Sequence, residues 1–314
     1  MNSLDSIGNA RLIVREVEKA IVGKDDVIIK VLLALIARGH ILMEDIPGVG
    51  KTTLAVSLSK ALGLQYNRVQ FTPDVLPSDI TGYSIYDKES SQMRYQKGAV
   101  LCNLFLADEL NRATSRTQSA LLQAMEEGEV TVDGKTYPVP QPFVVIATQN
   151  PTGAKGTQML PDSQMDRFML RLSLGYPSHE DEMEIIRRRQ SGIPLETVSQ
   201  VVDREKLMEI RRQADQVYIK ESVIDYIVSL CEKTRHDPRI VQGASPRAAL
   251  ALTALAKATA WIQGRDYVLA RDIRFVFHDC IAHRLLWSQE LPDEAAKDAV
   301  LEELFQAVKA PAVK

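Results

Sequence analysis

The chain has 314 residues, which is enough for a sizeable core and predicts two domains. Apolar residues make up 45% and charged residues 25%, as in ordinary soluble proteins. With 38 Lys and Arg against 41 Asp and Glu, the net charge of −3 provides no overall basic field, so we expect no binding to nucleic acid.

Cysteine usage and the apolar runs bear on the location of the protein. Cys102, Cys231 and Cys280 are far apart and odd in number, which favours reduced thiols in the cytoplasm. Residues 1–20 carry charges throughout, unlike a signal peptide, and the longest apolar run, 31–37, is too short to cross a bilayer. We therefore expect a cytoplasmic protein that is not an integral membrane protein.

Strand-length apolar runs alternate with helical patterns in the first half of the chain. Two helical patterns come first, 6–20 and 25–38. The apolar runs are 40–44, 66–71, 103–108, 143–148 and 168–174, with helical stretches at 51–62, 114–127 and 161–167 between them. This alternation predicts an α/β fold with a five-stranded parallel sheet flanked by helices. Insertions at 82–98 and 129–140 have the pattern of β-hairpins.

After Tyr176-Pro177 the pattern becomes helical. The predicted helices are 178–191, 203–214, 220–235, 245–263, 270–286 and 295–309. Ser178 and Ser245 are N-cap candidates at two of their starts. We therefore predict an α/β core over residues 1–177 and an all-α domain over 178–314.

Residues 45–52 read Asp-Ile-Pro-Gly-Val-Gly-Lys-Thr and connect an apolar strand to a helix. Glycines before Gly-Lys-Thr let backbone N–H groups turn toward an anion, and the helix adds the positive end of its dipole. Lys51 would reach the β- and γ-phosphates of a nucleotide, and the Thr52 hydroxyl would bind Mg²⁺. The predicted phosphate-binding residues are Pro47, Gly48, Val49, Gly50, Lys51, Thr52 and Thr53.

Asp45 occupies the position of the first glycine in the standard pattern for such a loop. Asp adopts left-handed backbone angles more readily than most residues, so the turn can survive the exchange. We expect its carboxylate to point away from the phosphates and to weaken or tune nucleotide binding rather than abolish it.

Two carboxylates follow the apolar strand 103–108. Because the carboxyl ends of parallel strands face the ligand crevice, Asp108 could hold Mg²⁺ and Glu109 could polarise an attacking water. Solvent-exposed acids at the end of a buried strand are the alternative. Their position about 55 residues after Gly-Lys-Thr, in the order that a phosphate-loop sheet requires, favours the catalytic interpretation.

Asn150 ends the next apolar strand and would lie beside the same water, where an uncharged amide can orient a nucleophile. An ordinary Asn-Pro turn is the alternative. Arg167 is either a cation at a helix C-terminus or an arginine finger for the γ-phosphate of a neighbouring subunit. Arg247 follows Ser245-Pro246 in a first helical turn, where a cation opposes the dipole, which favours a phosphate-sensing role across the domain cleft.

Motifs along nearly the whole chain resemble those of MoxR-family AAA+ ATPases. The matching segments are 22–24 (Val-Gly-Lys), 46–52, 70–82 (Gln-Phe-Thr-Pro-Asp-Val-Leu-Pro-Ser-Asp-Ile-Thr-Gly), 107–113 (Ala-Asp-Glu-Leu-Asn-Arg-Ala), 147–151 and 160–168. The resemblance implies an AAA+ core with a helical lid, ATP and Mg²⁺ as cofactors, and ring assembly, commonly hexameric. It assigns 82–98 as the helix-2 insert, Asn150 as sensor 1, Arg167 as the finger and Arg247 as sensor 2.

The resemblance also implies an adenine contact at Val22 and Gly23. It suggests protein clients with von Willebrand factor A domains and a chaperone role in metal or cofactor insertion. From these residues we expect a Mg²⁺-dependent ATPase that remodels partner proteins. Two alternatives stay open: a nucleotide-gated scaffold with little turnover, and an AAA+ motor acting on nucleic acid.

Overall fold

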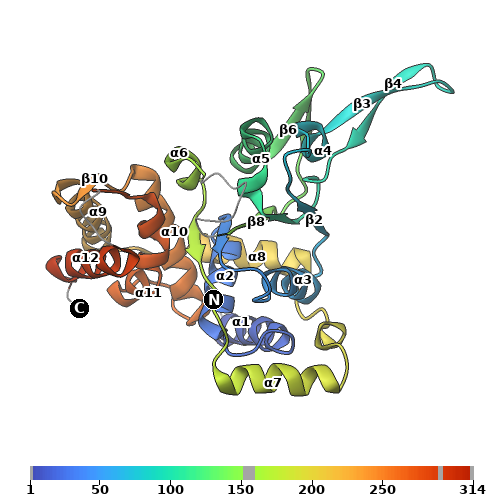
Figure 1. Ribbon diagram of the computed structural model, residues 1–314. Helices are drawn as coiled ribbons and strands as arrows, with labels where there is room; N and C mark the ends of the chain where they lie inside the picture. Colours follow the sequence, from blue (N-terminus) through green and yellow to red (C-terminus); the bar gives the residue numbers. More distant parts are fainter. Residues whose placement is uncertain (1–2, 151–159, 289–292, 312–314) are drawn as a thin grey trace.

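A five-stranded parallel sheet forms the centre of the protein, in the order β2-β5-β8-β1-β9 (Figure 1). The computed structural model describes residues 3–150, 160–288 and 293–311. The strands are β1 (Ile41–Glu44), β2 (Tyr66–Gln70), β5 (Leu104–Asp108), β8 (Val144–Gln149) and β9 (Leu170–Leu172). Each predicted apolar run forms a strand, and the predicted α/β fold is confirmed.

Helices cover both faces of the sheet because alternate side chains of each strand point to opposite faces. Leu104 and Leu106 pack in one hydrophobic cluster, while Phe105 and Ala107 pack in another. The first cluster includes residues of α1 (Ser3–Glu18), α2 (Asp25–Ile36) and α3 (Lys51–Ala61), and the second includes residues of α4 (Pro77–Thr81), α5 (Ser115–Glu127) and α6 (Asp162–Met165). The short helix α4 was not predicted.

Two hairpins form where the sequence predicts them and project from the core on the side away from α9 and α12 (Figure 1). The first joins β3 (Gly82–Asp87) to β4 (Gln92–Lys97), and the second joins β6 (Glu129–Val132) to β7 (Lys135–Pro138). The rings of Tyr95 and Tyr137 stack with centroids 3.9 Å apart. The hairpins therefore contact each other as well as the core.

The second half of the chain is mainly helical. Its helices are α7 (His179–Gln190), α8 (Arg204–Asp215), α9 (Glu221–His236), α10 (Pro246–Ile262), α11 (Ala270–Ile281) and α12 (Glu294–Ala307). The Ser178 and Ser245 side chains cap α7 and α10, as predicted. The prediction of an all-α domain was wrong in one detail, because Ile240–Gln242 (β10) and Leu286–Trp287 (β11) form a short antiparallel ribbon. Within the described ranges, no helix has the length and apolar character that a bilayer span requires.

Helix α7 lies along α1 at one end of the molecule and carries the chain past the core (Figure 1). Arg188 Nη1 donates to the carbonyl oxygen of Glu18 at 2.5 Å, and the Val201 N–H donates to that of Ala61 at 2.9 Å. Farther along, α11 packs beside β9. The boundary at residue 177 stays a prediction, since α7 and α8 already pack on core helices.

His283 and Arg284 attach the helical half to the core at Phe168. His283 Nε2 lies 2.9 Å and Arg284 Nη2 lies 2.7 Å from the Phe168 carbonyl oxygen. Burial, together with the neighbouring Arg284 charge, lowers the pKa of His283 from its ordinary 6.5 to about 3. The folded protein therefore holds this imidazole neutral at every pH above about 3.

We predict that His283 makes the fold sensitive to mild acid. Below pH 6.5 the unfolded chain binds a proton that the folded chain does not, so stability falls as the pH falls toward 3. Between pH 6.5 and 5 this residue should lower the free energy of unfolding by about 2 kcal/mol. Urea titrations should show a flatter pH dependence for His283→Gln, whereas the exposed control His236→Gln should behave like the wild type. Equal slopes for all three would contradict this assignment.

Candidate nucleotide-binding site

Two glycines shape the loop between β1 and α3. Gly48 has φ +89° and Gly50 has φ +103°, in the left-handed region that side chains disfavour. Gly50 is the N-cap of α3, which begins at Lys51, so the free N–H groups of the first turn face the loop. The geometry is that of an anion cradle at a helix N-terminus.

The Lys51 side chain, from the first residue of α3, folds back onto this loop. Its Nζ donates to the carbonyl oxygens of Asp45 at 2.7 Å and Ile46 at 3.2 Å. Burial lowers the pKa of Lys51, and the charges of Asp45, Asp108 and Glu109 oppose that shift. The ammonium group is therefore close to both carboxylates predicted for the site.

The Asp45 carboxylate turns away from the loop and bonds to the turn that follows β9. Its Oδ1 accepts hydrogen bonds from Ser173 Oγ at 2.7 Å and the Gly175 N–H at 3.0 Å. Its Oδ2 accepts from the Leu174 N–H at 2.7 Å. Asp45 is only 4% exposed, so these bonds satisfy a buried carboxylate. Its orientation away from the phosphates stays a prediction, which these bonds favour.

Asp108, at the carboxyl end of β5, is held from both flanking strands. Thr148 Oγ1 on β8 donates to Asp108 Oδ1 at 2.7 Å, and Arg68 Nη2 on β2 donates to Oδ2 at 2.7 Å. The same Thr148 oxygen accepts from the Glu109 N–H at 2.9 Å. The buried Thr148 hydroxyl therefore holds both the Asp108 carboxylate, the candidate ligand for Mg²⁺, and the backbone of Glu109, the candidate base.

Glu109 has φ +57°, a backbone conformation that costs about 1–3 kcal/mol in a residue other than glycine. Its Oε1 accepts from Asn150 Nδ2 at 3.2 Å. Its Oε2 accepts from Arg112 Nη1 at 2.8 Å and from Gln70 Nε2 at 3.4 Å. The structure thus brings Asn150 to Glu109. Pro151, which follows it in the matched motif, lies outside the described residues.

The sequence alone did not indicate four side chains that contact the two acids: Arg68, Gln70, Arg112 and Thr148. A polar residue near the carboxyl end of a strand is the local signal that Arg68, Gln70 and Thr148 share. Arg112 is three residues after Glu109, in a 3₁₀ turn. These signals mark the correct edge of the sheet but do not identify the partner of each residue.

The segment predicted to contact adenine lies beside the loop. A Cβ on Gly50 would lie 3.5 Å from Ile21 Cδ1, next to Val22. Gly23 has φ +67°, and a Cβ there would lie 2.1 Å from Asp181 Oδ2 at the start of α7. Any side chain at position 23 would therefore have to push the Asp181 carboxylate aside, and it would also be strained by the positive φ. The adenine contact at Val22 and Gly23 stays a prediction that this arrangement allows.

Arg167 and Arg247 both bind the Glu126 carboxylate. Arg247 Nη2 lies 2.6 Å from Glu126 Oε1, and Arg167 Nη1 pairs with Oε2. A cavity of about 260 Å³ is lined by both arginines together with Arg38 and His40, which precede β1. The phosphate loop follows β1, whose four residues span about 13 Å at 3.3 Å per residue.

The two arginines therefore lie near the amino ends of the parallel strands, whereas the phosphate loop of the same chain lies at their carboxyl ends. This differs from the expectation that Arg247 reaches across the domain cleft to a nucleotide on its own chain. The reason is the path of residues 178–215, which carry the helical half past α1 and α2 before α10 begins. That half then docks at β9, beside Arg167.

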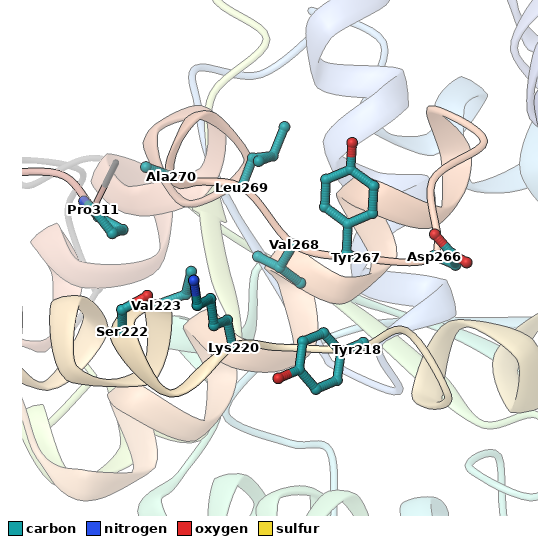
Figure 2. Close-up of a pocket in the computed structure, with 10 residues that line it drawn as sticks. All are labelled: Tyr218, Lys220, Ser222, Val223, Asp266, Tyr267, Val268, Leu269, Ala270 and Pro311. Atoms are coloured by element: carbon teal, nitrogen blue, oxygen red, sulfur yellow. The ribbon is translucent and has the colours of Figure 1, made fainter. Parts of the chain in front are cut away.

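A separate pocket of about 410 Å³ lies in the helical half (Figure 2). Tyr218 and Tyr267 lie on two segments joined by a parallel bridge, and Lys220 precedes α9. All ten lining residues come from positions 218–223, 266–270 and 311. The pocket shares no lining residue with the phosphate loop, so it is not part of the candidate nucleotide site.

Two family models match the chain. The model for the ATPase family associated with various cellular activities (AAA) matches residues 40–170, which contain β1, β2, β5 and β8 of the sheet, the loop and the paired acids. The AAA lid domain model matches residues 232–304. The fold and the site thus define an AAA+ ATPase with a helical lid.

Similar proteins narrow this class. YeaC of Bacillus subtilis is 42% identical over 95% of this chain and 93% of its own length. Chaperone MoxR1 of Mycobacterium tuberculosis is 37% identical over 95% of this chain and 81% of its own. A crystal structure of a protein from Cytophaga hutchinsonii, proposed to be an ATPase, has a TM-score of 0.90 and 38% identity, covering 99% and 97% of the two chains. The chain belongs to the MoxR family of AAA+ ATPases.

We predict that Asp45 contributes strongly to stability. Asp45→Ala would leave the buried Leu174 N–H and the half-buried Gly175 N–H without acceptors and should lower the free energy of unfolding by about 3 kcal/mol. Asp45→Asn, which keeps one acceptor oxygen, should cost less. The exposed control Asp74→Ala should change the urea midpoint little. An Asp45→Ala midpoint equal to that of the wild type would refute the role of this carboxylate.

Proposed function

We propose that the chain binds Mg²⁺ and ATP at residues 45–52 and hydrolyses ATP within a ring of identical chains. The observation that carries the proposal is the convergence of Lys51, Asp108 and Glu109 at one edge of the sheet, with Asn150 bonded to Glu109. We further propose that hydrolysis drives chaperone-like remodelling of partner proteins.

The residues present fit a magnesium–nucleotide complex. The left-handed Gly48 and Gly50 open the loop for an anion, and Lys51 would exchange the carbonyls of Asp45 and Ile46 for phosphate oxygens. The Thr52 hydroxyl and the Asp108 carboxylate are the hard oxygen donors that Mg²⁺ prefers. When bound, Mg²⁺ would neutralise charge on the β- and γ-phosphates.

Glu109 is the proposed base for water. Its carboxylate would accept a proton from the attacking water, and the Asn150 amide would orient that water. Thr148 keeps Glu109 and Asp108 in register, because its hydroxyl bonds to both residues. The Arg112–Glu109 ion pair must loosen before the attacking water can bind Glu109 Oε2, because the guanidinium occupies that oxygen.

Arg167 and Arg247 would act on the nucleotide of a neighbouring chain. Both lie away from the phosphate loop of their own chain and share one carboxylate, so they form a single cationic group on that surface. Two guanidinium groups would stabilise charge on the transferring phosphoryl group. This arrangement needs a head-to-tail ring, for which we propose a hexamer.

Protein clients are proposed on two grounds. The relative from Mycobacterium tuberculosis carries the name chaperone. The β3–β4 hairpin exposes large apolar side chains at Tyr83, Tyr86 and Met93, which soluble proteins commonly keep for partners. We propose clients with von Willebrand factor A domains, matured by metal or cofactor insertion in the cytoplasm.

One observation favours the alternative of a nucleotide-gated scaffold with little turnover. Glu109 pairs with Arg112 at 2.8 Å, and Lys51 is occupied by carbonyls of its own loop. Both residues would have to give up these partners before hydrolysis. Steady-state turnover by the wild type distinguishes the two candidates, because the scaffold would bind ATP and release almost no phosphate.

We predict that Glu109→Gln abolishes turnover and keeps nucleotide binding. Loss of the base should lower kcat by about 10²-fold or more, while Lys51 and the loop remain intact. Phosphate release and the affinity for a fluorescent ATP analogue would be measured together. The exposed control Glu232→Gln should match the wild type in both assays. Turnover equal to that of the wild type in Glu109→Gln would rule out Glu109 as the base.

A mixing experiment tests the assignment of Arg247 to the neighbouring site. Arg247→Ala chains keep their own acids, and Glu109→Gln chains keep their arginines. In an equal, random mixture about one quarter of the interfaces combine an intact acid site with intact arginines, so about one quarter of wild-type turnover should return. If Arg247 served the nucleotide of its own chain, mixing would restore nothing.

A further inference from the structure

Glu126 is the side chain that the two proposed phosphate-binding arginines share. Its Oε1 lies 2.6 Å from Arg247 Nη2, and its Oε2 pairs with Arg167 Nη1. Arg167 comes from the core after α6, whereas Arg247 comes from α10 of the helical half. The carboxylate therefore joins arginines from both halves of the chain.

Glu126 and Arg247 each lie at a helix end where the helix dipole disfavours their charge. Glu126 lies in the last turn of α5, where a negative charge opposes the helix dipole. Arg247 lies in the first turn of α10, where a positive charge opposes it. Each residue occupies the wrong helix end for its charge, and the two meet there. Residues that break a local rule in this way tend to serve a function.

Charge explains why the arginines need a shared partner. Two guanidinium groups held close together repel each other, and a carboxylate between them offsets that repulsion. Arg167 Nη1 also donates to the Leu122 carbonyl oxygen at 3.2 Å, and this bond holds the Arg167 side chain against α5. The Arg247 side chain is 45% exposed, and its Nη1 also lies 3.9 Å from Asp166 Oδ2. Glu126 thus sets the position of Arg247 relative to Arg167.

We propose that Glu126 is a positioning residue that holds Arg167 and Arg247 at the spacing needed to reach the phosphates of a neighbouring chain together. This inference rests on the proposed function and adds a residue to it. Glu126 acts through the arginines, so it should affect the transition state at the neighbouring site and leave nucleotide affinity at its own phosphate loop unchanged.

The test compares Glu126→Gln with Glu127→Gln. Both glutamates are exposed in the last turn of α5, but Glu127 bonds only to Gln123 among the described contacts. Glu126→Gln keeps the size of the side chain and removes its charge. Its kcat should fall about ten-fold, with nucleotide affinity and urea midpoint unchanged, while Glu127→Gln should match the wild type. An unchanged or raised kcat in Glu126→Gln would overturn the proposal.

Two further measurements separate positioning from a general structural effect. In an Arg247→Ala background, adding Glu126→Gln should lower kcat little further, because the arginine that Glu126 positions is already gone. A full additional ten-fold loss would overturn the proposal. Mixing Glu126→Gln chains with Glu109→Gln chains should restore turnover, since the latter supply intact arginines.

Wild-type turnover identifies which idea fails. If the wild type binds ATP and releases no phosphate, both the proposed function and the role of Glu126 fail. If the wild type is active and Glu126→Gln equals it, only the role of Glu126 fails.

Discussion

The carboxylate of Asp45 joins the first residue of the phosphate loop to the turn that leaves the edge strand of the sheet. Its three hydrogen bonds reach Ser173, Leu174 and Gly175, about 130 residues farther along the chain. A buried carboxylate is tolerated only with such partners, so the loop and the turn must move as one unit. Tyr176, directly after that turn, accepts a bond from Lys24 beside the proposed adenine segment. A change at the loop would therefore be transmitted to the start of the helical half.

Side chains from the strands on either side of β5 hold the two acidic residues of the site. Thr148 bonds to Asp108 and Glu109 at once, and this hydroxyl supports the left-handed backbone of Glu109. Arg68 and Arg112 neutralise the two acids, while loop carbonyls hold Lys51. These charged groups therefore have partners within the site, and phosphate and Mg²⁺ would replace some of those partners.

The features that the sequence predicted correctly depend on local pattern. Apolar runs of strand length identified the five strands, and the pattern at 129–140 identified the second hairpin. The Gly-Lys-Thr loop and the order of its partner strands indicated which edge of the sheet carries the site. Helix α4, with five residues, and the β10–β11 ribbon are too short for any period to be visible.

The features that were missed depend on contacts between distant segments. The partners of Asp45 and of Thr148 are set by strand order and register, which a single sequence does not display. Arg247 was predicted correctly as a locally unfavourable cation, but its location depends on the route of residues 178–215 around the core. Glu126 carries a comparable signal at a helix end, and only the fold brings it to Arg247.

We propose that each ATP site is completed by arginines from a second chain. The most direct measurement is ATP turnover per chain over a dilution series, with the assembly state followed by light scattering in the same samples. If the arginines come from a second chain, turnover per chain should fall on dilution together with the assembled fraction and be lost in the monomer. Constant turnover per chain across the range in which the ring dissociates would contradict it.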